Sequence, residues 1–60
     1  MTSNLLVIYE ITQKAAQVHT KKAYMEFERW VREVLQTYQD AAIEKVARIH
    51  LFKLKEELSF

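Results

Sequence analysis

The stretch LQTYQDAAIEKV, residues 35–46, decides how this chain folds, because the apolar face of the helix pattern changes sides within it. On a helical wheel of about 100° per residue, the apolar residues up to residue 42 gather within roughly 60° of Phe27. They are Ala16, Ala23, Tyr24, Trp30, Val31, Val34, Tyr38 and Ala42. From residue 43 onward the apolar residues gather on about the opposite side. They are Ile43, Val46, Ala47, Leu51, Leu54 and Leu58. One straight helix cannot turn both sides toward a single core, so the pattern predicts an all-α fold in which two helices form a hairpin.

The predicted break lies near residues 37–41, where Asp40 is suited to begin the second helix. An aspartate at this position accepts hydrogen bonds from the first free amides, and its charge suits the positive end of the helix dipole. The chain contains no glycine and no proline, the residues that most often mark turns. A single continuous helix of roughly 45 residues, with each half burying a different face, therefore stays open as the alternative.

Charge spacing supports helix along most of the chain. Acidic residues stand four positions before basic ones in Glu10/Lys14, Glu28/Arg32 and Glu44/Arg48. Pairs of this order and spacing stabilise helices. We therefore expect helix from about residue 13 to residue 57.

The N-terminal residues 4–11 carry a different pattern. The run Leu5–Tyr9 is apolar on every side and rich in residues that favour strands. It fits the start of a helix from Ser3 or Asn4, and it also fits a short strand that pairs with a copy of itself.

The chain has 60 residues, which makes it one small helical domain, residues 1–60, near the lower limit for a self-sufficient core. It has no cysteine, so no disulfide can stabilise it. A lone hairpin leaves one side of each helix open to water. We therefore expect a homo-oligomer, most simply a dimeric four-helix bundle. The residues expected at the interface between copies are Tyr24, Phe27, Trp30, Val31, Val34, Tyr38, Leu51, Leu54 and Leu58.

Ile49 and Phe52 depart from this pattern. Both fall on the charged side of the expected second helix, near Lys45 and Arg48 and away from its apolar face. Two large apolar side chains on a polar face indicate a second contact surface.

No pattern of catalytic side chains or metal ligands stands out. The two histidines, His19 and His50, have no carboxylate or second histidine one turn further along. Carboxylates such as Glu26 and Glu28 have basic neighbours, which is typical of a solvated helix face. We expect no catalytic residue, no cofactor and no metal site, and therefore no enzyme.

The net charge of +1 speaks against a general attraction to nucleic acid or anionic lipid. The longest apolar run is far shorter than the roughly 20 residues that span a bilayer. Nothing around it matches a signal peptide, so we expect a cytoplasmic protein without a membrane span.

These observations predict a non-catalytic interaction, adaptor or regulatory module whose partner is a second copy of itself or another protein. The alternative is a small nucleic-acid-associated regulator, because basic residues of the second helix would reach phosphates. The residues expected to do so are Lys45, Arg48, Lys53 and Lys55.

Overall fold

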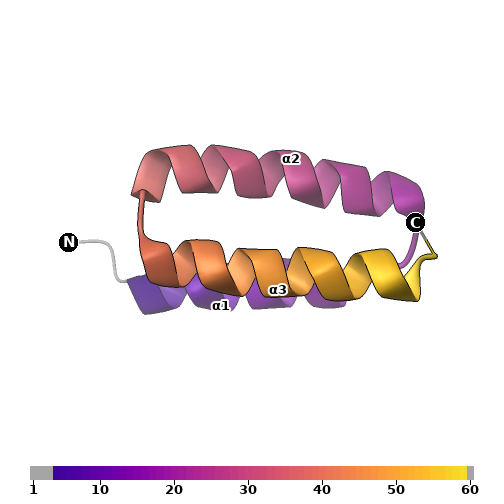
Figure 1. Ribbon diagram of the computed structural model, residues 1–60. Helices are drawn as coiled ribbons and strands as arrows, with labels where there is room; N and C mark the ends of the chain where they lie inside the picture. The colour runs from indigo at the N-terminus through magenta and orange to yellow at the C-terminus, as the bar shows by residue number, and fades with distance from the viewer. Residues whose placement is uncertain (1–3, 60) are drawn as a thin grey trace.

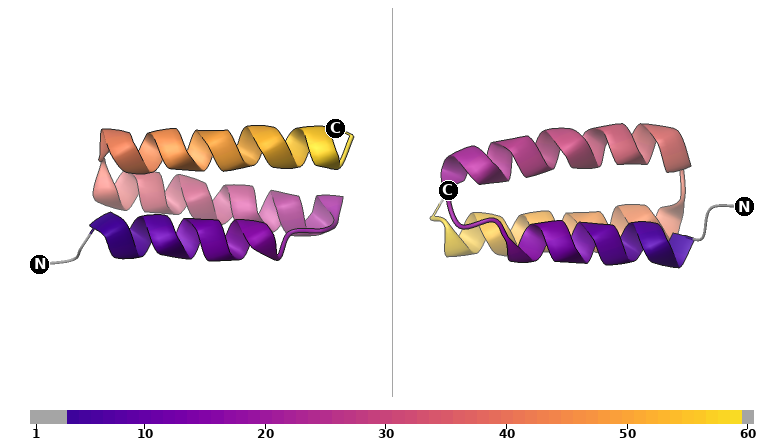
Figure 2. Two further views of the ribbon diagram at one scale, coloured as in Figure 1. Left: turned by 90° about the horizontal axis from the view of Figure 1, so that it is seen from below. Right: turned by 180° about the vertical axis from the view of Figure 1, so that it is seen from behind.

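Three helices lie side by side, and consecutive helices run in opposite directions (Figure 1). A computed structural model describes residues 4–59, with α1 at Asn4–Ala16, α2 at Lys21–Tyr38 and α3 at Ala41–Glu57. The bundle is 37 Å long, and α1 and α3 run in the same direction with α2 antiparallel to both (Figures 1 and 2). The all-helical fold predicted from the sequence is confirmed for the described residues.

The connection between α2 and α3 lies where the apolar stripe changes sides. The Asp40 carboxylate oxygen Oδ1 accepts hydrogen bonds from the backbone N–H groups of Ala42, at 2.8 Å, and Ile43, at 3.2 Å. Its other oxygen, Oδ2, accepts a hydrogen bond from the Asn4 side-chain amide at 2.6 Å. The predicted break at residues 37–41 is confirmed, and the alternative of one continuous helix is wrong.

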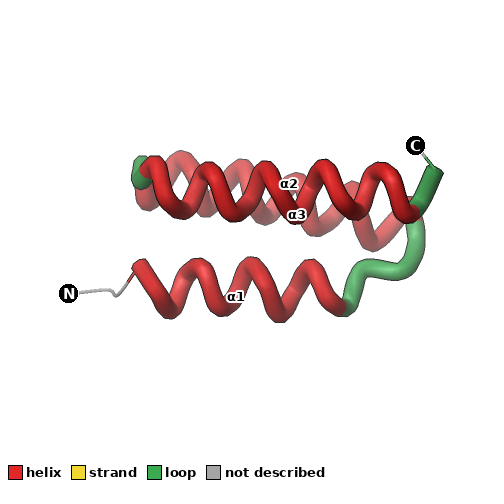
Figure 3. Tube along the Cα trace, turned by 60° about the horizontal axis from the view of Figure 1, so that its bottom comes forward, coloured by secondary structure: helices red, strands yellow, loops and turns green. Residues whose placement is uncertain are grey.

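The connection between α1 and α2 was not predicted. Backbone N–H groups of Gln17 and Val18 donate to carbonyls three residues earlier and close α1. Thr20, in an extended conformation, then caps α2 by accepting a hydrogen bond from the Ala23 N–H at 3.1 Å. Figure 3 shows this connection as the longer of the two loops. A threonine cap needs no glycine or proline, which is why the break is easily missed in this chain.

The predicted two-helix hairpin is therefore wrong, because residues 4–59 form three helices. The N-terminal segment is neither a strand nor the start of a longer helix, but a helix that ends at Ala16 and folds back (Figure 2). Ser3, the earlier of its two expected starts, lies outside the described residues.

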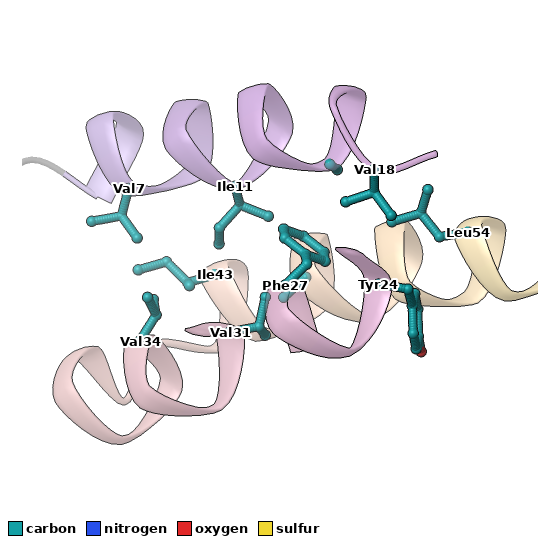
Figure 4. Close-up of a cluster of buried hydrophobic side chains, with 11 residues drawn as sticks. Val7, Ile11, Val18, Tyr24, Phe27, Val31, Val34, Ile43 and Leu54 are labelled. Atoms are coloured by element: carbon teal, nitrogen blue, oxygen red, sulfur yellow. The ribbon is translucent and has the colours of Figure 1, made fainter. Parts of the chain in front are cut away.

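One core lies along the axis of the bundle, and every helix contributes to it (Figure 4). Ile11 of α1, Val31 of α2 and Ile43 of α3 are the most completely buried large side chains. The other buried residues are Val7, Ala15, Val18, Tyr24, Phe27, Val34, Ala47 and Leu54. The two apolar stripes of the sequence thus meet inside one chain, and α1 covers the side that a hairpin would have left open.

We predict that Ile11→Ala lowers the free energy of unfolding by about 2–5 kcal/mol, because it opens a cavity in a fully buried site. The control is Met25→Ala, at a 64% exposed side chain of α2 outside the core, which should change it by less than about 0.5 kcal/mol. Urea unfolding followed by circular dichroism measures both. Equal, small effects would mean that α1 does not contribute to the core.

Candidate functional site

The outward sides of α1 and α3 carry large apolar side chains that the core does not use. On α1 these are Leu5, Leu6 and Tyr9, which are 76%, 64% and 62% exposed. On α3 they are Ile49 and Phe52, which are 47% and 64% exposed. We call these five residues the outer apolar face. Ile49 and Phe52 were expected to lie apart from the core, and both side chains are exposed.

Two contacts place Leu5 and Tyr9 of the outer apolar face relative to the neighbouring helices. Thr12 of α1 faces α3, because its Oγ1 lies 3.4 Å from His50 Nε2. Leu5 and Tyr9 precede Thr12 by seven and three residues and so share its side of the helix. Lys14, in contrast, faces α2, with its Nζ 4.9 Å from the centroid of the Trp30 ring. Leu5 and Tyr9 therefore lie on the α3 side of α1, away from α2.

The same reasoning places the two residues of α3. Lys53 lines a shallow groove of about 260 Å³ between α1 and α3, together with Thr12 and His50. Ile49 lies one turn before Lys53, and Phe52 lies three residues after Ile49. Both therefore lie on the α1 side or the outward side of α3. Figure 2, left, shows α1 and α3 side by side in front with α2 behind them.

Charge is distributed unequally over this surface. Lys45, Arg48 and Lys55 of α3 are exposed around Ile49 and Phe52. Arg48 pairs with Glu44 on its own helix, at 2.6 Å between Nη2 and Oε1. On α1, Gln13 shares the outward side with Tyr9, and the exposed Glu10 lies one turn after Leu6 at the edge of this side. The outward side of α1 is thus apolar with an acidic edge, whereas that of α3 is apolar and carries more cations than carboxylates, since Lys45, Arg48 and Lys55 lie there with Glu56.

The cations predicted to contact nucleic acid do not form one stripe. Lys45, Arg48, Lys53 and Lys55 are all exposed, but they spread over about 160° of the helix circumference. Glu56 lies between them, and Glu44 is paired with Arg48. The structure leaves these residues accessible without gathering them into a single phosphate-binding row.

The residues predicted to form an interface between copies lie in or against the chain's own core. Five are buried, namely Tyr24, Phe27, Val31, Val34 and Leu54. The other four, Trp30, Tyr38, Leu51 and Leu58, are partly buried against that core. Because α1 supplies the missing cover, a second copy is not required to shield them.

Sequence reasoning missed Leu5, Leu6 and Tyr9 as surface candidates. The signal was present in the run Leu5–Tyr9, which is apolar on all sides. A helix in a three-helix bundle needs apolar residues on one side only. The run therefore contains more apolar side chains than the core can take.

The described residues include no cluster of three or more His, Cys, Asp or Glu side chains that could hold a metal ion. His50 instead contacts Thr12, whose hydroxyl donates to the Ile8 carbonyl oxygen at 3.0 Å. The Thr12 oxygen is therefore left to accept a hydrogen bond from the imidazole.

Among residues 4–59, the buried Tyr24 has a phenol whose pKa is raised. Burial raises the pKa of its phenol above the ordinary value, and the charge of Glu28 and a hydrogen bond to that carboxylate act in the same direction. The nearby Arg32, which lies 3.6 Å from Glu28, opposes the rise. This phenol stays protonated in the core and is not poised to act as a base.

Comparison with protein families, with curated proteins and with solved structures found no match to this chain. Across residues 4–59, the helices are all too short or too polar to cross a bilayer.

We predict that stability falls as the pH rises through the alkaline range in which Tyr24 ionises. The folded state raises the pKa of this phenol, so it holds the proton more tightly than the unfolded chain does. The resulting stabilisation is complete below the unfolded pKa of about 10 and is lost as the pH rises through the folded pKa. Thermal melting between about pH 8 and 11.5 should show this loss.

Tyr24→Phe should reduce the loss of stability at alkaline pH, because it removes the ionising group. Glu28→Gln keeps the phenol but removes the carboxylate charge, which lowers the folded pKa, so the loss of stability should be smaller and complete at lower pH. An alkaline profile that neither substitution changes would exclude Tyr24 as its source.

Proposed function

We propose that this chain is a non-catalytic protein-interaction module that self-associates through the outer apolar face of Leu5, Leu6, Tyr9, Ile49 and Phe52. The observation that carries the proposal is that large exposed apolar side chains lie on two neighbouring helices, α1 and α3 (Figure 2), outside the core. Large apolar side chains grouped on a surface and edged by polar residues are typical of contact sites.

The size of the face suits a second copy of the chain. Five large side chains that are each about half or more exposed present on the order of 600 Å², at the upper end of the largest patch on an ordinary monomer. A standard interface covers about 800 Å² on each partner. A second copy brings the same apolar face, so a two-fold contact covers both faces at once.

The charges favour a protein partner over a lipid or nucleic-acid surface. The net charge is +1, and Arg48 on this face is already paired with Glu44. Binding to phosphates gains strength from many unpaired cations. An apolar centre with a mixed-charge edge is what protein interfaces present.

We predict that Phe52→Ser shifts self-association to at least tenfold higher concentration, since aromatic anchors at the centre of an interface contribute about 2 kcal/mol or more. Met25→Ser is a matched control, because Met25 of α2 is also 64% exposed but lies away from the outer apolar face. Sedimentation velocity across a concentration series measures the shift. Circular dichroism shows whether both variants keep the helical fold.

The proposal fails if the parent chain sediments as a monomer up to millimolar concentration, or if Met25→Ser weakens association as much as Phe52→Ser. Salt-sensitive binding of the monomer to DNA or RNA would favour the nucleic-acid alternative instead. Binding of the monomer to anionic vesicles, lost in Phe52→Ser, would assign the face to a lipid surface.

A further inference from the structure

We infer that the two copies pair crosswise, with α1 of one copy lying on α3 of the other and both helices running in the same direction. This inference rests on the proposed self-association and adds the arrangement of the subunits. It depends on three features of the outer apolar face, namely the parallel direction of its helices, its charges and its register.

The direction of the helices limits how two copies can meet. The outer apolar face is built on two parallel neighbours, α1 and α3 (Figure 2). If the two-fold axis runs along the helices, α1 faces α3 of the second copy. If the axis runs across them, α1 faces α1 and α3 faces α3, each pair antiparallel. These are the two limiting arrangements of an isologous contact through this face.

The charges distinguish the two arrangements. On the outward side of α3, Lys45, Arg48 and Lys55 outnumber Glu56, so pairing α3 with α3 sets two mainly basic surfaces against each other. Opposed like charges disfavour such an interface. The crosswise arrangement sets these cations against α1, where the exposed charge at the edge of the outward side is the carboxylate of Glu10. The long aliphatic parts of Lys45 and Arg48 can then cover apolar surface while their charged ends stay in water.

The register between α1 and α3 brings suitable residues opposite each other. Asn4 bonds Asp40, and Thr12 contacts His50. A residue of α1 therefore lies at the same height along the bundle axis as the residue of α3 whose number is about 37 higher. A two-fold axis that runs along the helices leaves the height of every residue along the bundle unchanged, so the same offset holds between α1 of one copy and α3 of the other. Tyr9 of one copy then lies between the levels of Lys45 and Ile49 of the other. An apolar side chain and a cation are both favourable neighbours of a tyrosine ring.

Single-cysteine crosslinking tests the arrangement directly, because the natural chain contains no cysteine. Gln13→Cys marks the outward side of α1, and Arg48→Cys marks that of α3 at a similar level. Both sites are exposed and lie outside the five apolar residues. Each variant is first checked by sedimentation for association like that of the parent. The variants are then treated, alone and in an equimolar mixture, with a short bis-maleimide crosslinker.

Crosswise pairing predicts that the mixture gives several-fold more crosslinked dimer than either variant alone, and that mass spectrometry identifies this dimer as the Gln13→Cys/Arg48→Cys product. The inference is overturned if Arg48→Cys alone crosslinks as well as the mixture, because α3 would then face α3. It is also overturned if associated chains give no crosslink in any sample. A chain that does not associate at all is seen in the sedimentation step, and that result contradicts the proposed function itself.

Discussion

Burial of one branched side chain from each helix, Ile11, Val31 and Ile43, is the interaction on which the rest of the structure depends. These side chains lose nearly all contact with water only when the three helices are present together (Figure 4). A chain of this length has little spare core and no disulfide or glycine-based turn to support it. The apolar stripe of α1 therefore matters as much as the stripes of the two longer helices.

The two chain reversals are made by polar caps. Thr20 and Asp40 each accept hydrogen bonds from amides in the first turn of the helix that follows. Such caps satisfy donors that have no partner inside the helix. Asp40 has a further role, because its second carboxylate oxygen bonds Asn4 and holds the start of α1 level with the start of α3. This contact, together with Thr12 and His50, sets the register of the face where the exposed apolar side chains lie.

One side of α1 packs into the core, and its other side carries exposed apolar side chains. Val7, Ile11 and Ala15 are spaced by four residues and enter the core. Leu5 and Leu6 precede Val7, Tyr9 lies between Val7 and Ile11, and all three side chains remain exposed. Ile49 and Phe52 extend this apolar surface onto α3. The core and the proposed contact surface are thus separate, so the chain can bury its core alone and still offer an apolar face to a second copy.

Several features were predictable from local pattern alone. The lack of glycine and proline, together with acid–base pairs four residues apart, indicated helix. The change of apolar side and the aspartate at residue 40 located the break between α2 and α3. The position of Ile49 and Phe52 opposite the other apolar residues of that helix indicated exposed side chains, as found. All of these depend on helical periodicity and capping, which are local properties.

Only the tertiary structure decided what covers the core. The break at residues 17–20 is made by a threonine cap that no glycine or proline marks, so α1 was not recognised as a separate helix. Without α1, residues such as Phe27 and Leu54 lack cover, which is why the sequence pattern of a hairpin predicts a second copy over them. Likewise, the run Leu5–Tyr9 does not show which of its apolar residues face inward. That choice depends on how α1 rotates against α2 and α3, and the rotation is set by contacts between residues far apart in the chain.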